Sequence, residues 1–349
     1  MKNNLFVRVD VSSSIGTGHF FRCLALSQNL KSNFNEIIFL INKSSLKITK
    51  ILEKNKFKFL YLSENLNNDK SIIEFFTNTL KDYSTHNNFI LIDNYSIDFT
   101  MESHIRHLFQ KIIVIDDLAN RKHDCDLLID QNYYENFENR YDFILSKNTV
   151  KLLGPKYAII RDEFKEIPKK QFQTDSKIKN ILISFGGVDP TNECTKALKS
   201  IMSLQFEDVQ ITIIAGMFNQ NFFKLNETYQ NYKNIRIFQH VDNLGELMSN
   251  ADIFIGAGGT TTWERLYLGL PSMITIISEN QHESVEFLSK QNQIINLGLA
   301  KNVSLSTYKK AITELNSEDL IQLSERNKQL IDGNGIQRIK KQIIELIND

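Results

Sequence analysis

Hydrophobic and polar residues follow one another along this chain in blocks of two kinds. Short runs rich in Ile, Leu, Val and Phe are separated by longer stretches in which apolar residues recur every three or four positions. The short runs are typical of strands buried on both faces of a parallel sheet, and the longer stretches are typical of amphipathic helices. The pattern therefore predicts an α/β protein.

Two successive series of these blocks predict two domains. In the first series we expect strands at 5–10, 36–41, 57–62, 89–93, 111–116 and 127–130, and helices at 18–30, 44–54, 70–81 and 97–109. In the second we expect strands at 181–185, 209–215, 235–239, 252–256, 273–277 and 294–297, and helices at 192–203, 220–230, 244–249, 260–268 and 282–291.

The predicted domain limits follow from composition. Residues 1–164 form a Rossmann-like domain, the polar segment 165–179 is a linker, 180–335 form a second Rossmann-like domain, and 336–349 add a C-terminal helix. A length of 349 residues agrees with two domains. Ligands of such sheets bind beyond the carboxyl ends of the strands, so the residues that follow each strand are the candidates for function.

Charge and composition narrow the class of protein. The chain has 41 basic and 41 acidic residues, which argues against a nucleic-acid partner. No apolar run approaches the ~20 residues of a membrane span, and residues 1–10 mix charges into a strand-like run, unlike a signal peptide. Three scattered cysteines predict neither a disulfide scaffold nor a zinc site. We expect a cytoplasmic protein without stable membrane insertion.

The segment after the first strand contains two glycines and a histidine. Gly16 and Gly18 permit a tight turn and a close ligand, and the helix that follows offers free N–H groups. His19 at the helix start can accept a proton from water near neutral pH. Asp10 could orient this histidine or form a loop hydrogen bond, and Arg22 could meet a phosphate or form a salt bridge.

Other strand ends carry further candidates. Tyr95 could form a hydrogen bond to a sugar or pack on the sheet edge. Asp116 with Asp117 could be acid–base groups, metal ligands or turn caps. Gly186 and Gly187 suit close approach either to a phosphate or to the other domain.

The segment 256–264, Gly-Ala-Gly-Gly-Thr-Thr-Thr-Trp-Glu, is the strongest of these signals. Its glycines leave room for a diphosphate, its threonines are expected to cap the next helix, and Glu264 could accept both hydroxyls of a ribose. Asn280 and Gln281 can each donate and accept, as sugar hydroxyls and amides require. Backbone groups around Val241 could contact a base edge.

Together these motifs resemble those of the pseudaminic acid pathway UDP-sugar hydrolases, relatives of the lipid II-forming glycosyltransferase. The resemblance covers roughly residues 5–345 and is carried by the motifs at 16–19, 22–26, 93–95, 153–158, 184–192, 256–264 and 279–281. It implies the GT-B fold, with two Rossmann-like domains and a cleft between them. It also implies hydrolysis of UDP-2,4-diacetamido-2,4,6-trideoxy-β-L-altropyranose to UDP and the free sugar.

The same resemblance assigns roles to residues. His19 is implied to be the general base that activates water for inverting attack at the anomeric carbon, without metal or cofactor. Substrate binding is implied for Asp10, Gly16, Gly18, Arg22, Tyr95, Asn280 and Gln281. UDP binding is implied for Gly186, Gly187, Val241, Gly258, Gly259, Thr260, Thr261 and Glu264.

Other interpretations stay open at this point. A GT-B glycosyltransferase would share the fold and the nucleotide site, and a 2-epimerase or an inactive nucleotide-sugar sensor is less well supported by the residues. Asn- and Lys-rich loops near 64–70 and 132–147 depart from shorter members of the family. We expect a UDP-sugar as ligand, no nucleic acid, and a monomer or weak oligomer.

Overall fold

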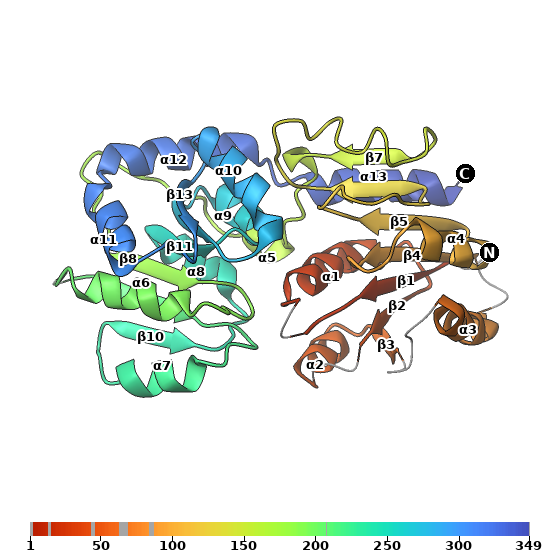
Figure 1. Cartoon of the computed structure of the whole chain (residues 1–349), viewed down its shortest axis with the longest axis horizontal. Helices are drawn as coiled ribbons and strands as arrows, with labels where there is room; N and C mark the ends of the chain where they lie inside the picture. Colours follow the sequence, from red (N-terminus) through yellow and green to blue (C-terminus); the bar gives the residue numbers. More distant parts are fainter. Residues whose placement is uncertain are drawn as a thin grey trace.

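Two parallel β-sheets organise the chain (Figure 1). The structure is a computed structural model that describes residues 3–12, 15–42, 46–62, 69–83, 87–206 and 208–348. In the first sheet the strand order is β3-β2-β1-β4-β5-β6-β7, and in the second it is β10-β9-β8-β11-β12-β13. Each sheet thus places its earliest strand in the interior, as two-sided α/β sheets do.

The first sheet is formed by seven strands. They are β1 (Asn3–Val9), β2 (Glu36–Ile41), β3 (Lys58–Tyr61), β4 (Asn87–Asp93), β5 (Lys111–Ile115), β6 (Leu127–Asp130) and β7 (Val150–Leu153). The helices in this half are α1 (Gly18–Leu30), α2 (Leu46–Lys54), α3 (Asp69–Leu80), α4 (Phe99–Ile105) and α5 (Asp162–Lys165), with short 3₁₀ turns η1 (Lys81–Tyr83), η2 (Arg106–Leu108) and η3 (Pro155–Tyr157).

The second sheet is formed by six strands. They are β8 (Asn180–Ser184), β9 (Gln210–Ile214), β10 (Ile235–Phe238), β11 (Ile253–Ala257), β12 (Ser272–Ile276) and β13 (Ile295–Leu299). The helices are α6 (Glu193–Met202), α7 (Phe222–Tyr229), α8 (Leu244–Asn250), α9 (Thr262–Leu268), α10 (His282–Lys290), α11 (Leu305–Glu314), α12 (Ser317–Leu330) and α13 (Gly335–Asn348), with the 3₁₀ turn η4 (Glu279–Gln281).

Both faces of each sheet are buried under helices, which explains the unbroken apolar runs in the sequence. Along β1, Leu5 and Val7 belong to one core cluster, and Phe6 between them belongs to the cluster on the opposite face. Along β8, Ile183 and Leu182 divide in the same way between two clusters of the second sheet. Each domain therefore has two apolar layers, one on either side of its sheet.

The last helix returns to the first domain. Ile339 and Ile343 of α13 pack in the same core cluster as Phe20 of α1, and Figure 1 shows α13 lying along the first sheet. The first residue of this helix is Gly335. A glycine is required there because a Cβ would lie 2.1 Å from the carbonyl oxygen of Ala158. The two domains are therefore connected by two crossings of the chain.

The predicted strands and helices are present in the described residues, with ends shifted by a few positions. The sequence missed β7, a short strand at the edge of the first sheet. The predicted boundary at residue 164 also differs from the packing, because Ile160 and Phe164 already belong to the core of the second domain. Most of the predicted insertion at 64–70 lies outside the described residues. Of the helices that are described, none has the length and apolar composition needed to cross a membrane.

Candidate active site

A cavity of ≈ 910 Å³ lies between the two domains. It is lined by the segments that follow β1, β4, β5 and β6 in the first domain and β8 to β12 in the second. This is the position at which open α/β sheets bind ligands. Most residues that the sequence singled out line this cavity: Gly16, Gly18, Arg22, Tyr95, Gly186, Gly187, Val241, Gly258, Gly259, Thr260, Thr261, Glu264, Asn280 and Gln281.

His19 lies in the first turn of α1, beside this cavity rather than in its lining, with 8% of its surface exposed. Its Nδ1 is 2.6 Å from Oδ1 of Asp93 at the end of β4. Nη2 of Arg22 also lies 3.0 Å from this nitrogen, but the shorter contact is with a carboxylate, which only accepts hydrogen bonds. We therefore assign the hydrogen of the neutral ring to Nδ1, which leaves a lone pair on Nε2. The ring also meets the ring of Tyr95 edge to face, with centroids 4.7 Å apart.

Arg22 connects Asp93 to a second carboxylate. Its Nε and Nη2 donate to the two oxygens of Asp93, both at 2.7 Å, and its Nη1 donates to Asp117 at 3.0 Å. Burial alone would raise the pKa of Asp93, but the charges and hydrogen bonds of Arg22 and His19 outweigh it and hold this pKa well below its usual value. Asp93 is therefore ionised at neutral pH, and Arg22 forms salt bridges while also lining the cavity.

Asp10 does not orient His19, contrary to one of the roles considered from the sequence. Its carboxylate accepts two hydrogen bonds from Arg8, at 2.5 and 2.8 Å, and one from Asn94 at 2.6 Å. The strand β4 pairs directly with β1, which brings Asp93 rather than Asp10 to the histidine. Asp10 also lies outside the cavity lining.

Tyr95 connects the first domain to the second. Its hydroxyl accepts a hydrogen bond of 3.0 Å from Nδ2 of Asn280, which follows β12. Burial, followed by the nearby carboxylate of Asp117, raises the pKa of Tyr95 above its ordinary value, so the phenol stays protonated. Near these residues, Arg140 donates to Glu283 at 3.3 Å, again across the two domains.

The glycines after β1 and β8 lie against the opposite domain. A Cβ on Gly18 would be 2.8 Å from Oγ1 of Thr260, and one on Gly187 would be 3.3 Å from the backbone nitrogen of Thr17. The sequence left open whether Gly187 approaches a phosphate or the other domain, and the structure shows the second. The backbone amides at the start of α6 are meanwhile capped by Asp189, at 2.7 and 3.0 Å.

The predicted capping role of the threonines at 260–262 is wrong. Thr261 is the N-cap residue of α9, but its side chain forms no capping hydrogen bond. Its hydroxyl instead accepts from Arg265 at 3.0 Å, and the Thr262 hydroxyl accepts from the same guanidinium at 2.9 Å. Glu264 is buried at the cavity with each carboxylate oxygen bound to Arg161, at 2.6 and 2.9 Å.

Several residues that line the cavity were not predicted from the sequence. Arg161, Tyr134 and Arg140 line the cavity but come from segments without glycine or strand-end motifs. The sequence signal for Arg161 was a charge that ends the apolar run 158–160. Of the pair after β5, Asp117 lines the cavity, whereas Asp116 accepts from the Ala119 amide at 2.9 Å and so caps the turn.

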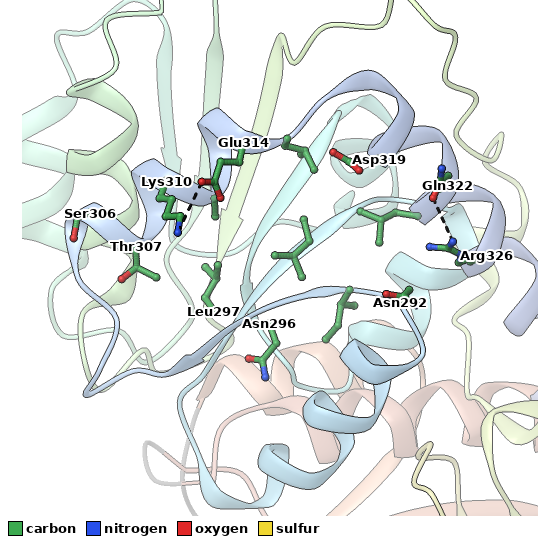
Figure 2. A pocket seen from close by; sticks show the side chains of 15 residues that line it. Asn292, Asn296, Leu297, Ser306, Thr307, Lys310, Glu314, Asp319, Gln322 and Arg326 are labelled. Atoms are coloured by element: carbon green, nitrogen blue, oxygen red, sulfur yellow. Dashed lines mark hydrogen bonds and ion pairs between the residues drawn. The ribbon is translucent and has the colours of Figure 1, made fainter.

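A second groove, of ≈ 860 Å³, lies away from this cavity between β13, α11 and α12 (Figure 2). Figure 2 shows Lys310 and Glu314 on its rim, joined by an ion pair of 3.8 Å. It shares no lining residue with the cavity between the domains. Nowhere in the described residues do three His, Cys, Asp or Glu side chains gather in a way that could hold a metal ion.

The sequence matches known proteins in both halves. Residues 181–343 match the glycosyltransferase family 28 C-terminal domain. The chain is 33% identical over 282 residues to an uncharacterized protein of Methanocaldococcus jannaschii, covering 78% of this chain and 56% of that protein. It therefore spans little more than half the length of that relative. It is also 26% identical over 287 residues to the UDP-2,4-diacetamido-2,4,6-trideoxy-β-L-altropyranose hydrolase of Campylobacter jejuni subsp. jejuni, covering 81% and 95% of the two chains.

Solved structures with the same architecture include glycosyltransferases and UDP-N-acetylglucosamine 2-epimerases. MurG of Acinetobacter baumannii superposes with a TM-score of 0.65 at 15% identity, covering 99% of this chain and 100% of that one. UGT71G1 of Medicago truncatula, complexed with UDP-glucose, superposes with a TM-score of 0.67 at 12% identity, covering 100% and 99%. The predicted fold class is confirmed: this chain has the GT-B fold.

Proposed function

We propose that this protein hydrolyses a UDP-linked diacetamido sugar, with water attacking the anomeric carbon and UDP leaving. The observation that carries the proposal is the buried His19–Asp93 pair beside the cavity between the domains. The likeness to the Campylobacter jejuni subsp. jejuni hydrolase, which extends over most of both chains, supports this reaction and this class of sugar.

In the proposed reaction His19 is the general base. Ionised Asp93 accepts the Nδ1 hydrogen, which leaves Nε2 to take a proton from water. The water oxygen forms a bond to the anomeric carbon, the bond from that carbon to the diphosphate oxygen breaks, and its electron pair leaves with UDP. A water that attacks opposite the leaving group gives the inverted anomer. Arg22 holds Asp93 in place through two hydrogen bonds.

The nucleotide is proposed to lie on the second domain. Gly258, Gly259, Thr260 and Thr261 line the cavity there, next to the buried Glu264. A carboxylate has about four acceptor positions, and Arg161 occupies one on each oxygen, so Glu264 can still accept from the two hydroxyls of a ribose. Gly186, Gly187 and Val241 complete this side of the proposed site.

The sugar is proposed to lie between the domains. Tyr95 and Asn280 already bond to each other across the cavity, so a hydroxyl or acetamido group placed there meets one group from each domain. Gln281, Gly16 and Gly18 line the same region. A sugar held from both sides brings its anomeric carbon between the first-domain base and the second-domain diphosphate site.

A GT-B glycosyltransferase is the second candidate. It is favoured by the match of residues 181–343 to the glycosyltransferase family 28 C-terminal domain. In that reaction a hydroxyl of an acceptor takes the place of water, while His19 and the nucleotide site keep the same roles.

Proton NMR of the protein with UDP-2,4-diacetamido-2,4,6-trideoxy-β-L-altropyranose tests the proposal. We expect UDP and the free sugar to form, with the inverted anomer appearing first. His19→Ala should bind UDP as the unaltered protein does but lose turnover by a factor of about 10² or more. UDP binding without any turnover would contradict the hydrolase and favour the transferase, and full turnover by His19→Ala would contradict the assigned base.

A further inference from the structure

Arg265 is a fully buried arginine behind the segment 256–264, with an exposed fraction of 0%. Its guanidinium donates to the hydroxyls of Thr261 and Thr262, at 3.0 and 2.9 Å, and to the carbonyl oxygen of Ala257 at 3.2 Å. These three acceptors flank Gly258 and Gly259, where the diphosphate is proposed to lie. The side chain therefore holds both ends of that glycine turn.

No carboxylate of the described residues lies within ion-pair distance of Arg265. The adjacent Glu264 directs both oxygens to Arg161, which also pairs with Glu163 at 2.8 Å. Nε of Arg265 is buried without a hydrogen-bond partner, and the ring of Phe254 lies 4.1 Å from the guanidinium carbon. The charge of Glu264 still acts on Arg265 from beyond ion-pair distance. A buried charge without a salt bridge of its own is costly to a fold, and an anion bound at the adjacent turn reduces that cost.

The starts of two helices lie beside this turn. The threonine hydroxyls at the start of α9 accept from Arg265 and form no cap, so no side chain of the described residues neutralises the backbone N–H groups of that first turn, and they add to the charge of Arg265. The amides at the start of α6 are capped by Asp189. Burial lowers the pKa of the Arg265 guanidinium to about 9, which leaves it protonated at neutral pH.

We propose that Arg265 is a buried positioning residue for the diphosphate, fixing the turn at Gly258 and Gly259 and placing behind it a positive charge that forms no salt bridge among the described residues. The ligand class is a nucleoside diphosphate, which Arg265 attracts without touching. This inference rests on the proposed function, because it takes UDP as the ligand of this turn. The charge of Arg265 would thus cause the site to bind UDP more tightly than neutral uridine.

Calorimetric titration of UDP and uridine into the unaltered protein and Arg265→Gln tests this inference. Glutamine keeps a hydrogen-bond donor but removes the charge. We expect the UDP affinity to fall about tenfold or more, as expected for a charge acting across several ångströms of protein, while uridine affinity changes less than about twofold. Arg326→Gln is the matched control, since Arg326 is exposed on α12 at the separate groove and the same net charge is lost.

If Arg265 had only a structural role, Arg265→Gln would lose affinity for UDP and for uridine to the same extent. This result would overturn the inference. If thermal melting shows that Arg265→Gln does not fold, Arg265→Lys replaces it. A buried lysine loses its proton more readily, so its preference for UDP over uridine should fall between about pH 6 and about pH 9 relative to the unaltered protein. An unchanged preference over that range would overturn the inference.

The outcomes separate the two proposals. An unaltered protein that binds UDP but does not hydrolyse the UDP-sugar contradicts the proposed hydrolysis and leaves the assignment of Arg265 standing. An unaltered protein without affinity for UDP contradicts both.

Discussion

The two glycine-rich segments of this protein occupy equivalent places and carry opposite charge arrangements. One follows β1 and the other follows β11, both interior strands, and each leads into a helix at the same cavity. In the first, Arg22 is shared by two carboxylates, Asp93 and Asp117, and His19 bonds to one of them.

In the second segment the balance is reversed. Each carboxylate oxygen of Glu264 accepts a hydrogen bond from Arg161, and Arg265 forms no salt bridge among the described residues. The first segment thus surrounds a proton acceptor with paired charges, and the second keeps a positive charge for an anion. Glycine spacing alone does not distinguish these two arrangements, because the deciding partners lie elsewhere in the sequence. In the proposed reaction the first segment transfers the proton and the second binds the diphosphate.

Replacement of Asp93 should change activity the most, and it tests whether proton transfer can be lost while nucleotide binding is kept. Asp93→Asn replaces the carboxylate that fixes the His19 tautomer by a neutral amide that can also donate, so kcat should fall by a factor of about 10² to 10⁴. The UDP affinity measured by calorimetry should stay within about twofold, because Asp93 lies outside the lining of the cavity. Asp10→Asn is the comparison variant, and its kcat should fall less than about threefold, because Asp10 bonds to Arg8 and Asn94. Equal losses in both variants would contradict the assigned partner of His19.

Alanine substitutions of two glycines test how tightly the second segment is packed. A Cβ on Gly256 would lie 1.9 Å from the carbonyl oxygen of Ser184, on the paired strand β8, whereas one on Gly259 meets nothing within 4 Å. Gly256→Ala should therefore lower the free energy of unfolding by about 3 kcal/mol or more, and Gly259→Ala by less than about 1 kcal/mol. Denaturant unfolding of both variants measures this, and equal costs would show that the turn is not constrained by its backbone neighbours.

The pH dependence of stability tests the carboxylates that surround the first segment. Burial, followed by the charge of Asp117, raises the pKa of Asp130 to about 8. A carboxyl that is protonated when folded but ionised when unfolded stabilises most below about pH 4, and its contribution declines as pH rises to about 8. Asp130→Asn should remove this decline.

The melting temperature of Asp130→Asn relative to the unaltered protein should accordingly rise by a few degrees between about pH 5 and about pH 8. Asp82→Asn, at an exposed position, should show a constant difference over the same range. Parallel pH curves for Asp130→Asn and the unaltered protein would contradict the raised pKa.

The smallest effect concerns the hydrogen bond that joins the domains. Tyr95→Phe removes the hydroxyl that accepts from Asn280, so KM for the UDP-sugar should rise about two- to tenfold with a smaller change in UDP affinity. Asn280→Ala should give a similar change, and the double variant should add little to either. Tyr232→Phe, exposed in the second domain outside the cavity, is the control. Fully additive losses would show that Tyr95 and Asn280 act separately.

The sequence was sufficient for most of the fold because both sheets are buried on two faces. Strands such as β2 and β6 are continuous apolar runs, and their ends match the predicted ones. The strand β7 escaped prediction because it has four residues, one of them the exposed Lys151, at the sheet edge.

The candidate site was predictable only where a motif lay in one stretch of sequence. The glycines, His19 and Glu264 were found in this way, and they lie at or beside the cavity. Asp93 was not identified as the partner of His19, because strand pairing rather than sequence distance brings them together across 74 positions. The sequence gives no sign of the role of Arg265, because that role depends on Glu264 bonding to Arg161 rather than to its neighbour.

Hydrolysis of the UDP-sugar in water enriched with oxygen-18 directly tests the division of roles between the two segments. If water attacks the anomeric carbon, as the assignment of proton transfer to the first segment requires, mass spectrometry will find the heavy oxygen in the free sugar and none in UDP. Heavy oxygen in UDP would mean attack on phosphorus at the second segment, and it would contradict the division of roles between the two segments.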